Sequence, residues 1–389
     1  MWLYTDFDYK TFLLYTPFTV VLTGLLWRIF KRYPSTIIMQ PTRENQYLIS
    51  QCPSLVEYRP TPWIFNGHMM TVFGVLFRPL LSMSFERVLL SVDAEGGTIA
   101  VDWHRQPRPR QPILLILHGL TGGSDNEYIR WMISYASSKL DLCCVVTHAR
   151  GCGKSKLTSP KSFNASNTDH VRASLKNIRS RVGDETPIFA VGYSLGAGIL
   201  AKFLGEEGSG CSLQGAIVCC ASFDMLLSAK NLERWLYIHI YNRRLTNNLI
   251  RYIQQHEDHF VRHDSDINLN LQTAYRSRTV REFDKNVIVP MHGFRDVEHY
   301  YSEASSHEWI KYIRIPTLIL SAADDPICPI DGLPVKEVLN NASIIAVKTL
   351  EGGHVSYLQG WWPKSFSYDN IVVGEYIQAL LKQMNYGCS

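Results

Sequence analysis

Residues 188–199 read Ile-Phe-Ala-Val-Gly-Tyr-Ser-Leu-Gly-Ala-Gly-Ile and contain the pentapeptide Gly192-Tyr-Ser-Leu-Gly196. The apolar run 188–191 predicts a buried strand, and the run 195–204 predicts a helix. A sharp strand-to-helix turn of this kind lifts the hydroxyl of Ser194 above a sheet, and only glycine tolerates the crowding on either side. Because the N-terminus of the helix offers free N–H groups, the stretch indicates a nucleophilic serine beside an oxyanion site.

The composition of the 389-residue chain is typical of a globular protein with a substantial core, with 46% hydrophobic and 19% charged residues. The net charge of +4 is small for this length, and no basic stripe with interleaved aromatic residues occurs, so no nucleic-acid partner is expected. The nine cysteines lack metal-ligand spacing, and Cys143-Cys144 and Cys219-Cys220 lie in strand-like runs. We therefore expect buried free thiols, no metal and no cofactor.

From residue 86 on, apolar runs alternate with segments of helical periodicity. Strands are predicted at 87–91, 98–103, 113–117, 142–147, 188–191, 215–220, 317–320 and 344–347, and helices at 128–140, 171–182, 195–204 and 369–384. Unbroken apolar strands separated by helices indicate an α/β fold whose mostly parallel sheet carries helices on both faces. The first two strands, joined by a short turn, add an antiparallel edge.

One long segment, residues 222–312, interrupts this alternation. It contains no clear apolar strand, and helices are predicted near 230–256 and 296–312. An insertion after the nucleophile predicts a lid or cap; the alternative is a helical excursion that only covers the sheet edge. Residues 34–85 are too apolar for a disordered linker, so we expect them to pack as an N-terminal extension on the domain at 86–389.

The N-terminal segment, residues 1–33, differs in kind from the rest. Residues 11–27 carry no charge and have aromatic residues at both ends, as in a membrane-interface belt. We predict a single-pass membrane anchor, in the endoplasmic reticulum or another internal membrane; the alternative is an amphipathic or core helix. Basic residues after the span favour a cytoplasmic domain, but Pro17 and the shortness of the span leave the orientation open.

A serine hydroxyl needs a base and an acid, and this topology predicts the order serine, acid, histidine. One predicted strand leads into Asp324-Asp325 followed by Pro-Ile-Cys-Pro, and the next leads into Glu351-Gly-Gly-His354. Both loops follow the carboxyl ends of parallel strands, where open α/β sheets build their sites. We predict His354 as the base and Asp325 as its partner, because the proline turn would aim that carboxylate inward. Asp324, which could cap the turn, stays the alternative.

An oxyanion hole needs a second backbone N–H beside that of Leu195. Residues 118–124, His-Gly-Leu-Thr-Gly-Gly-Ser, follow a predicted central strand, and their glycines allow a close backbone approach. We assign the second donor to Leu120, with Thr121 as the alternative. The sequence Arg-Gly-Cys-Gly-Lys-Ser at 150–155 lacks the glycine spacing of a phosphate loop, so we interpret it as a turn that lines the site.

These motifs together resemble the α/β-hydrolase superfamily and, within it, the abhydrolase-domain 1, 2 and 3 subgroup. The resemblance covers the chain from about residue 50 to its end and rests on six motifs, at 66–73, 118–124, 150–153, 163–169, 192–196 and 281–284. The chain departs from the pattern at Met69-Met70, where such proteins often have Leu-Gln, and at His170, where a second acid is common. The resemblance implies an α/β-hydrolase fold with a triad of Ser194, Asp325 and His354.

It also implies a membrane-anchored serine hydrolase that acts on lipid esters at the membrane surface, including the acyl chains of phospholipids. In the expected mechanism Ser194 attacks the ester carbonyl, His354 transfers the proton, and water resolves the acyl-enzyme. Two alternatives stay open. The same triad could pass the acyl group to an alcohol, as an alcohol O-acyltransferase, or the pocket could serve a non-catalytic binder of lipids or steroids.

Overall fold

The computed structural model describes residues 9–263 and 269–384, with side chains from Thr19 onward. A nine-stranded sheet forms its centre, in the order β1-β9-β8-β7-β6-β4-β5-β3-β2. The strands are β1 (Thr36–Met39), β2 (Glu86–Ser91), β3 (Thr98–Trp103), β4 (Ile113–Leu117), β5 (Cys143–Thr147), β6 (Ile188–Tyr193), β7 (Gly215–Cys219), β8 (Thr317–Ala322) and β9 (Ile344–Thr349). Strands β4 to β9 pair in parallel, whereas β1, β2 and β3 pair antiparallel at the two edges.

Helices cover both faces of the sheet, as the sequence predicted. On one face, α4 (Glu127–Lys139) and α16 (Tyr368–Gln383) share a buried apolar cluster with the strands. On the other, α5 (Asp169–Val182) and α6 (Leu195–Glu207) do the same, with the short α15 (Val335–Leu339) beside them. The mostly parallel α/β fold class is therefore confirmed, and both pairs of adjacent cysteines lie buried in it as free thiols.

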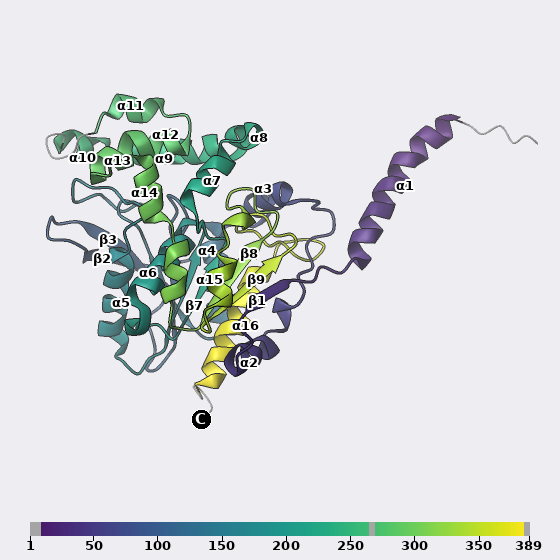
Figure 1. Cartoon of the computed structure of the whole chain (residues 1–389), viewed down its shortest axis with the longest axis horizontal. Helices are drawn as coiled ribbons and strands as arrows, with labels where there is room; N and C mark the ends of the chain where they lie inside the picture. Colours follow the sequence, from purple (N-terminus) through teal and green to yellow (C-terminus); the bar gives the residue numbers. More distant parts are fainter. Residues whose placement is uncertain (1–8, 264–268, 385–389) are drawn as a thin grey trace, which may run out of the picture.

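Residues 222–263 and 269–312 form a helical cap at one end of the sheet (Figure 1). The described residues of this segment contain no strand; they form α7 (Met225–Leu232), α8 (Trp235–Tyr237), α9 (Arg243–Gln255), α10 (Glu257–Arg262), α11 (Leu271–Arg276), α12 (Val280–Phe283), α13 (Val289–His292), α14 (Val297–Ala304), π-helical turns at Ile238–Asn242 and Asp284–Ile288, and a 3-10 helix at His307–Tyr312. The cap has its own apolar cluster, which also takes in Phe163 from the loop before α5.

Residues 34–85 pack on the domain through α2 (Arg43–Gln51), a 3-10 turn (Pro53–Leu55) and α3 (Gly67–Phe77). Buried residues of the first two, Leu48 and Leu55, join the cluster under α16. The sequence did not predict β1, which adds an antiparallel edge to β9. Its four residues are too few to show a period of two, and they lie between Pro34 and Pro41, residues that are unfavourable inside a sheet.

The predicted membrane span, residues 11–27, falls within α1 (Tyr9–Phe30), which extends away from the body of the molecule (Figure 1). Ten of the helix's residues, 9–18, lie outside the part whose side chains are described. Among the described residues, no helix combines the length and the apolar character needed to cross a membrane. The transmembrane anchor is thus not confirmed.

Candidate active site

Ser194 lies directly after β6 and caps the N-terminus of α6, with φ of 55° and ψ of −118°. A non-glycine residue adopts this left-handed region only under strain, as expected of a nucleophile turn. A Cβ added to Gly192 would lie 2.6 Å from the carbonyl oxygen of Gly196, and one added to Gly196 would lie 2.4 Å from that of His118. Both glycines of the pentapeptide are therefore required by the close approach of the backbone.

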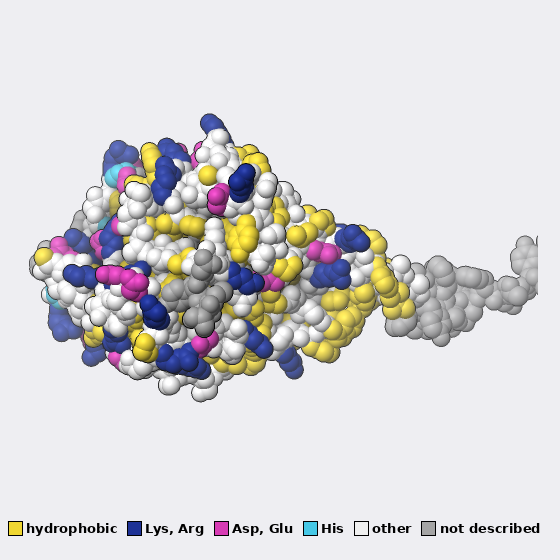
Figure 2. Space-filling view, turned by 90° about the horizontal axis from the view of Figure 1, so that it is seen from below, with side chains coloured by type: hydrophobic (Ala, Val, Ile, Leu, Met, Phe, Trp, Pro, Cys, Tyr) yellow, Lys and Arg dark blue, Asp and Glu magenta, His cyan; other side chains and the backbone are white. Residues whose placement is uncertain are grey.

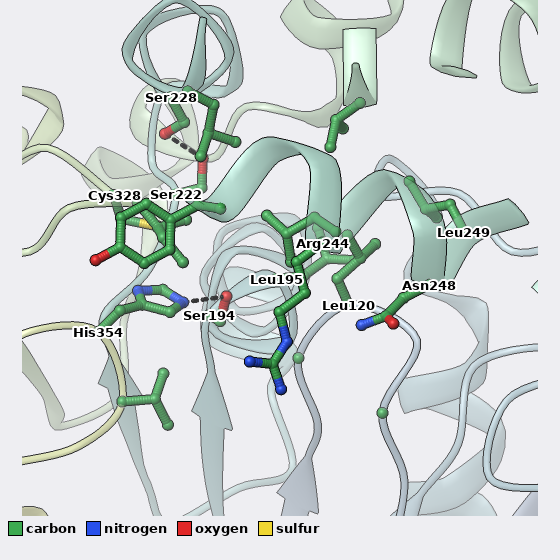
Figure 3. A pocket seen from close by; sticks show the side chains of 18 of the residues that line it. Leu120, Ser194, Leu195, Ser222, Ser228, Arg244, Asn248, Leu249, Cys328 and His354 are labelled. Carbon is green, nitrogen blue, oxygen red and sulfur yellow. Dashed lines mark hydrogen bonds between the residues drawn. The ribbon is translucent and has the colours of Figure 1, made fainter. Parts of the chain in front are cut away.

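The structure brings Ser194, His354 and Asp325 together from the loops after β6, β9 and β8. His354 Nε2 lies 2.8 Å from Ser194 Oγ, and His354 Nδ1 lies 2.9 Å from Asp325 Oδ2 (Figure 3 shows the first of these contacts). Because a carboxylate can only accept, Nδ1 carries the proton and Nε2 accepts from the serine hydroxyl. This arrangement has the geometry of a nucleophile, its base and the group that orients the base.

Asp325 is held by more than His354. Its Oδ1 accepts hydrogen bonds from the backbone N–H groups of Ile327 at 2.8 Å and Cys328 at 2.9 Å, and the residue is only 7% exposed. The backbone N–H groups of the Pro-Ile-Cys-Pro turn therefore hold the carboxylate of Asp325 toward His354. This is how the turn directs the carboxylate inward, as the sequence predicted.

Asp324, the alternative acid, contacts the backbone of the His354 loop, whereas the hydrogen bonds of His354 Nδ1 go to Asp325. The Oδ1 of Asp324 accepts the N–H of Gly353 at 2.9 Å, and its Oδ2 is buried without a partner among the described residues. Burial raises the pKa of Asp324 to about 6, and the nearby charges of Glu351 and Asp325 add to that shift. Asp324 thus braces the loop that carries His354, while Asp325 contacts the imidazole.

The backbone donors beside Ser194 favour Leu120 over Thr121. The N–H of Gly119 is taken by the hydroxyl of Tyr128 at 2.8 Å. Within the part of the chain that the structure describes, the N–H groups of Leu120 and Leu195 make no hydrogen bond, so they are free for a ligand. Both residues line the cavity that contains Ser194, whereas Thr121 does not.

Helix α3 positions the loop of His354, a role that the sequence did not reveal. Thr71 Oγ1 accepts the backbone N–H of His354 at 2.8 Å and donates to the carbonyl of Gly67 at 2.7 Å. A Cβ on Gly353 would lie 2.7 Å from the same carbonyl oxygen, so the loop and the helix are in close contact. The sequence feature that could have indicated this helix is Asn66, whose side chain caps the N-terminus of α3 by accepting the N–H of Met69.

The end of α1 is also fixed to this loop. Arg28 forms two hydrogen bonds to Glu351, at 2.6 and 3.0 Å, and two to the carbonyls of Pro62 and Ile64. The arginine is only 8% exposed. Glu351 precedes His354 by three residues, so α1 is connected to the loop of the base through a buried ion pair. The sequence identified Arg28 only as part of a basic flank.

A cavity of about 360 Å³ opens over Ser194 and His354. Most of its wall is apolar and comes from α3 and from the cap; the apolar lining includes Val72, Val75, Met225, Leu232, Ile240, Leu249, Ile253, Phe283 and Ile288. Three charged side chains, Glu127, Arg244 and Asp284, also border it. Burial raises the pKa of Asp284 to about 7, and its Oδ2 accepts from the hydroxyl of Tyr301 at 2.9 Å. Such a cavity suits a long apolar group with a polar end.

The turn at 150–155 does not line this cavity, contrary to the sequence interpretation. Arg150 forms an ion pair with Asp93 at 2.6 Å and borders a separate polar cavity. The backbone carbonyls of Arg150 and Gly151 contact Tyr252 and His256, each at 2.9 Å. The turn therefore supports α9 of the cap, because its glycines expose backbone carbonyls on the side of the helix.

One group of potential metal ligands occurs among the described residues: Cys220, Asp325 and His354. Burial raises the pKa of the Cys220 thiol well above its ordinary value, with the charge of Asp325 adding to the shift, so no thiolate is available there. The imidazole is already engaged at both nitrogens, by Asp325 and Ser194. These donors fit a proton relay better than a metal centre, and the absence of a metal stays a prediction.

A mostly parallel sheet with a serine on a strand-to-helix turn, and with a histidine and an acid after later strands, defines a hydrolase of the α/β type. A model of the α/β hydrolase fold family matches residues 112–360, and the chain belongs to this family. The esterase Pf2001 of Pyrococcus furiosus shares the fold, with 14% identity, a TM-score of 0.50, and coverage of 77% of this chain and 96% of that structure.

Relatives place the chain in the abhydrolase-domain subgroup. It is 32% identical to the embryogenesis-associated protein EMB8 of Picea glauca over 84% of this chain and 73% of the relative. It is 29% identical to phospholipase ABHD3 of Mus musculus over 87% and 82%, and 34% identical to the monoacylglycerol lipase of Saccharomyces cerevisiae over 65% and 55%. With this family and these relatives, the chain is an ester-hydrolysing enzyme.

Proposed function

We propose that the protein is a serine hydrolase of lipid carboxylic esters, above all of the acyl esters of phospholipids. The observation that carries the proposal is the chain of hydrogen bonds from Ser194 through His354 to Asp325. Two of these residues, Ser194 and His354, line a mostly apolar cavity. Similarity to a phospholipase and to a monoacylglycerol lipase supports the same substrate class.

In the proposed mechanism, His354 Nε2 takes the proton of Ser194 as Oγ attacks the ester carbonyl. The N–H groups of Leu120 and Leu195 stabilise the oxyanion of the tetrahedral intermediate. The imidazolium, stabilised by Asp325, gives its proton to the leaving alcohol as the ester C–O bond breaks. His354 then deprotonates a water that attacks the acyl-enzyme, which releases the fatty acid and regenerates the serine.

Exposed apolar side chains around the cavity support action at a bilayer. Trp235 of α8 is 80% exposed and Trp362, beside α3, is 66% exposed. Val72 and Val75 of α3 are also exposed, and both line the cavity. Figure 2, which views the molecule from the side opposite the cap, shows further hydrophobic side chains at the end of the body from which α1 extends. Large exposed aromatic residues are typical of surfaces that insert into a membrane interface.

We further propose that α1 and the exposed apolar side chains named above hold the enzyme on the bilayer. In this proposal α1 makes a single pass through the membrane of the endoplasmic reticulum or of another internal compartment. The cap at 222–312 then acts as the lid over the cavity. An enzyme held at the membrane meets its lipid substrate at a high effective concentration.

The test is an assay of the full chain on phosphatidylcholine vesicles, with and without ethanol, in which fatty acid and ethyl ester are measured separately. We expect fatty acid as the main product in both cases, and none from Ser194→Ala. Ethyl ester without fatty acid would replace the hydrolase proposal with alcohol acyl transfer. Lipid binding with no product of either kind would replace it with a non-catalytic binder.

A further inference from the structure

Arg244 is a charged residue of the cavity wall that the proposed mechanism does not use. It lies on α9 of the cap, and its side chain is exposed. Figure 3 shows the guanidinium extending from α9 into the cavity that also holds Ser194 and His354. Within residues 9–263 and 269–384, Arg244 forms no ion pair shorter than 4.0 Å and no hydrogen bond. The guanidinium of Arg244 is therefore available to bind a negatively charged group of a ligand in this cavity.

Among the described residues, the polar groups that line the cavity with Arg244 form no hydrogen bond or ion pair with its guanidinium. Asn248, one helical turn further along α9, lines the same cavity, because residues four apart share a helix face. Glu127, at the start of α4, is an acidic group that lines the same cavity. Burial raises the pKa of the Glu127 carboxyl, and the positive charges of Arg78 and Arg244 partly oppose that shift. Asp284 also borders the cavity, but its contact is with Tyr301.

We propose that Arg244, assisted by Asn248, binds the phosphodiester group of a phospholipid substrate. The inference rests on the proposed function, because it needs a lipid ester at Ser194. A guanidinium presents a planar fork of donors that matches two phosphate oxygens, and such charge-assisted bonds are among the stronger ones in proteins. With the phosphate at Arg244, an acyl chain enters the apolar part of the cavity and its ester carbonyl faces the serine.

This subsite would select phospholipids over neutral glycerides. A diacylglycerol carries the same acyl esters but has nothing to pair with the guanidinium. Since Arg244 forms no hydrogen bond and no ion pair within the described chain, its replacement removes no bond of either kind from the fold. An effect of the substitution on one substrate class is therefore an effect on recognition.

The test compares Arg244→Met with Arg243→Met, its neighbour on α9. Arg243 is also exposed but does not line the cavity over Ser194, so it controls for the loss of one positive charge from the same surface. Three substrates are used: phosphatidylcholine and diacylglycerol with identical acyl chains in the same mixed micelles, and p-nitrophenyl butyrate in solution.

We expect Arg244→Met to lower kcat/KM for phosphatidylcholine by about 10- to 100-fold, the range for losing a hydrogen bond to a charged group. Activity on the other two substrates should stay within about twofold, and Arg244→Lys should recover part of the loss. Arg243→Met should leave all three within about twofold.

An equal loss on all three substrates, an unchanged rate on phosphatidylcholine, or an equal loss in Arg243→Met would overturn the headgroup subsite. Each of these outcomes requires a wild-type enzyme that hydrolyses esters, so it leaves the proposed function standing. A wild type inactive on all three esters would instead overturn the proposed function, and the subsite with it.

Discussion

Substitution of Asp325 by asparagine separates the orientation of His354 from the rest of the site. In the structure, Asp325 Oδ1 accepts two backbone N–H groups, and Oδ2 accepts the Nδ1 proton of His354. An asparagine can keep its oxygen on the backbone donors, which places its amide nitrogen against Nδ1. Because that nitrogen donates, the imidazole must carry its proton on Nε2 instead, where it can no longer take the proton of Ser194.

The expected loss in kcat is about 10⁴-fold, the cost of the wrong tautomer in a Ser-His-Asp triad, which corresponds to about 5.5 kcal/mol of transition-state stabilisation. The KM for a p-nitrophenyl ester should change little, because Asp325 does not line the cavity. The thermal unfolding temperature should also stay close to that of the wild type, because both backbone contacts remain.

Asp324→Asn is the matched control in the same assay. Its oxygen can still accept the N–H of Gly353, and its amide nitrogen takes the place of a buried carboxylate oxygen that has no partner among the described residues. We expect its kcat to stay within about tenfold of the wild type. The reasoning would be refuted if Asp324→Asn were the more damaging change, or if Asp325→Asn lost less than about tenfold.

Three further outcomes are expected. Arg28→Met leaves the largely buried Glu351 without its partner, so it should lower the free energy of unfolding by up to about 3–5 kcal/mol, and Arg28→Met/Glu351→Met should recover most of that loss in denaturant titrations; a single variant as stable as the wild type would contradict this. The pKa of Asp284, about 7 in the folded state against an ordinary 3.8, means that the native state keeps a proton which the unfolded chain releases, so stability should fall as the pH rises from about 4 to about 7. Asp284→Asn should remove that slope and exceed the wild type by about 2–4 kcal/mol at pH 8, as measured by unfolding at pH 4, 6 and 8, and parallel curves would count against it. Trp235→Ser/Trp362→Ser should weaken co-sedimentation with phosphatidylcholine vesicles by about tenfold or more, with activity on a soluble ester unchanged, and unaltered sedimentation would show that these side chains do not insert.

The central sheet could be predicted because its strands are buried on both faces and therefore appear as unbroken apolar runs. Even their ends are close to the predicted ones: β3 and β4 match residue for residue, and β6 continues only two residues further, to the position before Ser194. The edge strand β1 is only half buried, and such a strand leaves little periodic signal in four residues.

The three residues of the proposed triad could be predicted because the topology of a parallel sheet determines which loops lie side by side. The carboxyl ends of β6, β8 and β9 lie at one edge of the sheet, so Ser194, Asp325 and His354 followed from chain order. Thr71 and Arg28 could not be found in this way. Their contacts with the His354 loop join positions separated by 283 and 323 residues, and no local pattern encodes such a pair.

The role of the turn at 150–155 was mistaken for a related reason. The sequence correctly indicated a turn, but it does not say which element the turn contacts. In the structure the partner is α9 of the cap, through Tyr252 and His256. The apolar wall of the cavity also comes largely from the cap, whose short helices and π-helical turns have no single repeating period to read.

The role of Ser194 as the nucleophile can be tested directly by labelling the full chain with a fluorophosphonate and locating the adduct by peptide mass spectrometry. Such a probe reacts with a serine only where a base activates the hydroxyl and an oxyanion site receives the phosphoryl oxygen. We expect one adduct, on Ser194, and none in Ser194→Ala, with the loss of phosphatidylcholine hydrolysis proportional to labelling. An unlabelled Ser194, or full hydrolysis by the labelled enzyme, would contradict the claim that this serine is the nucleophile.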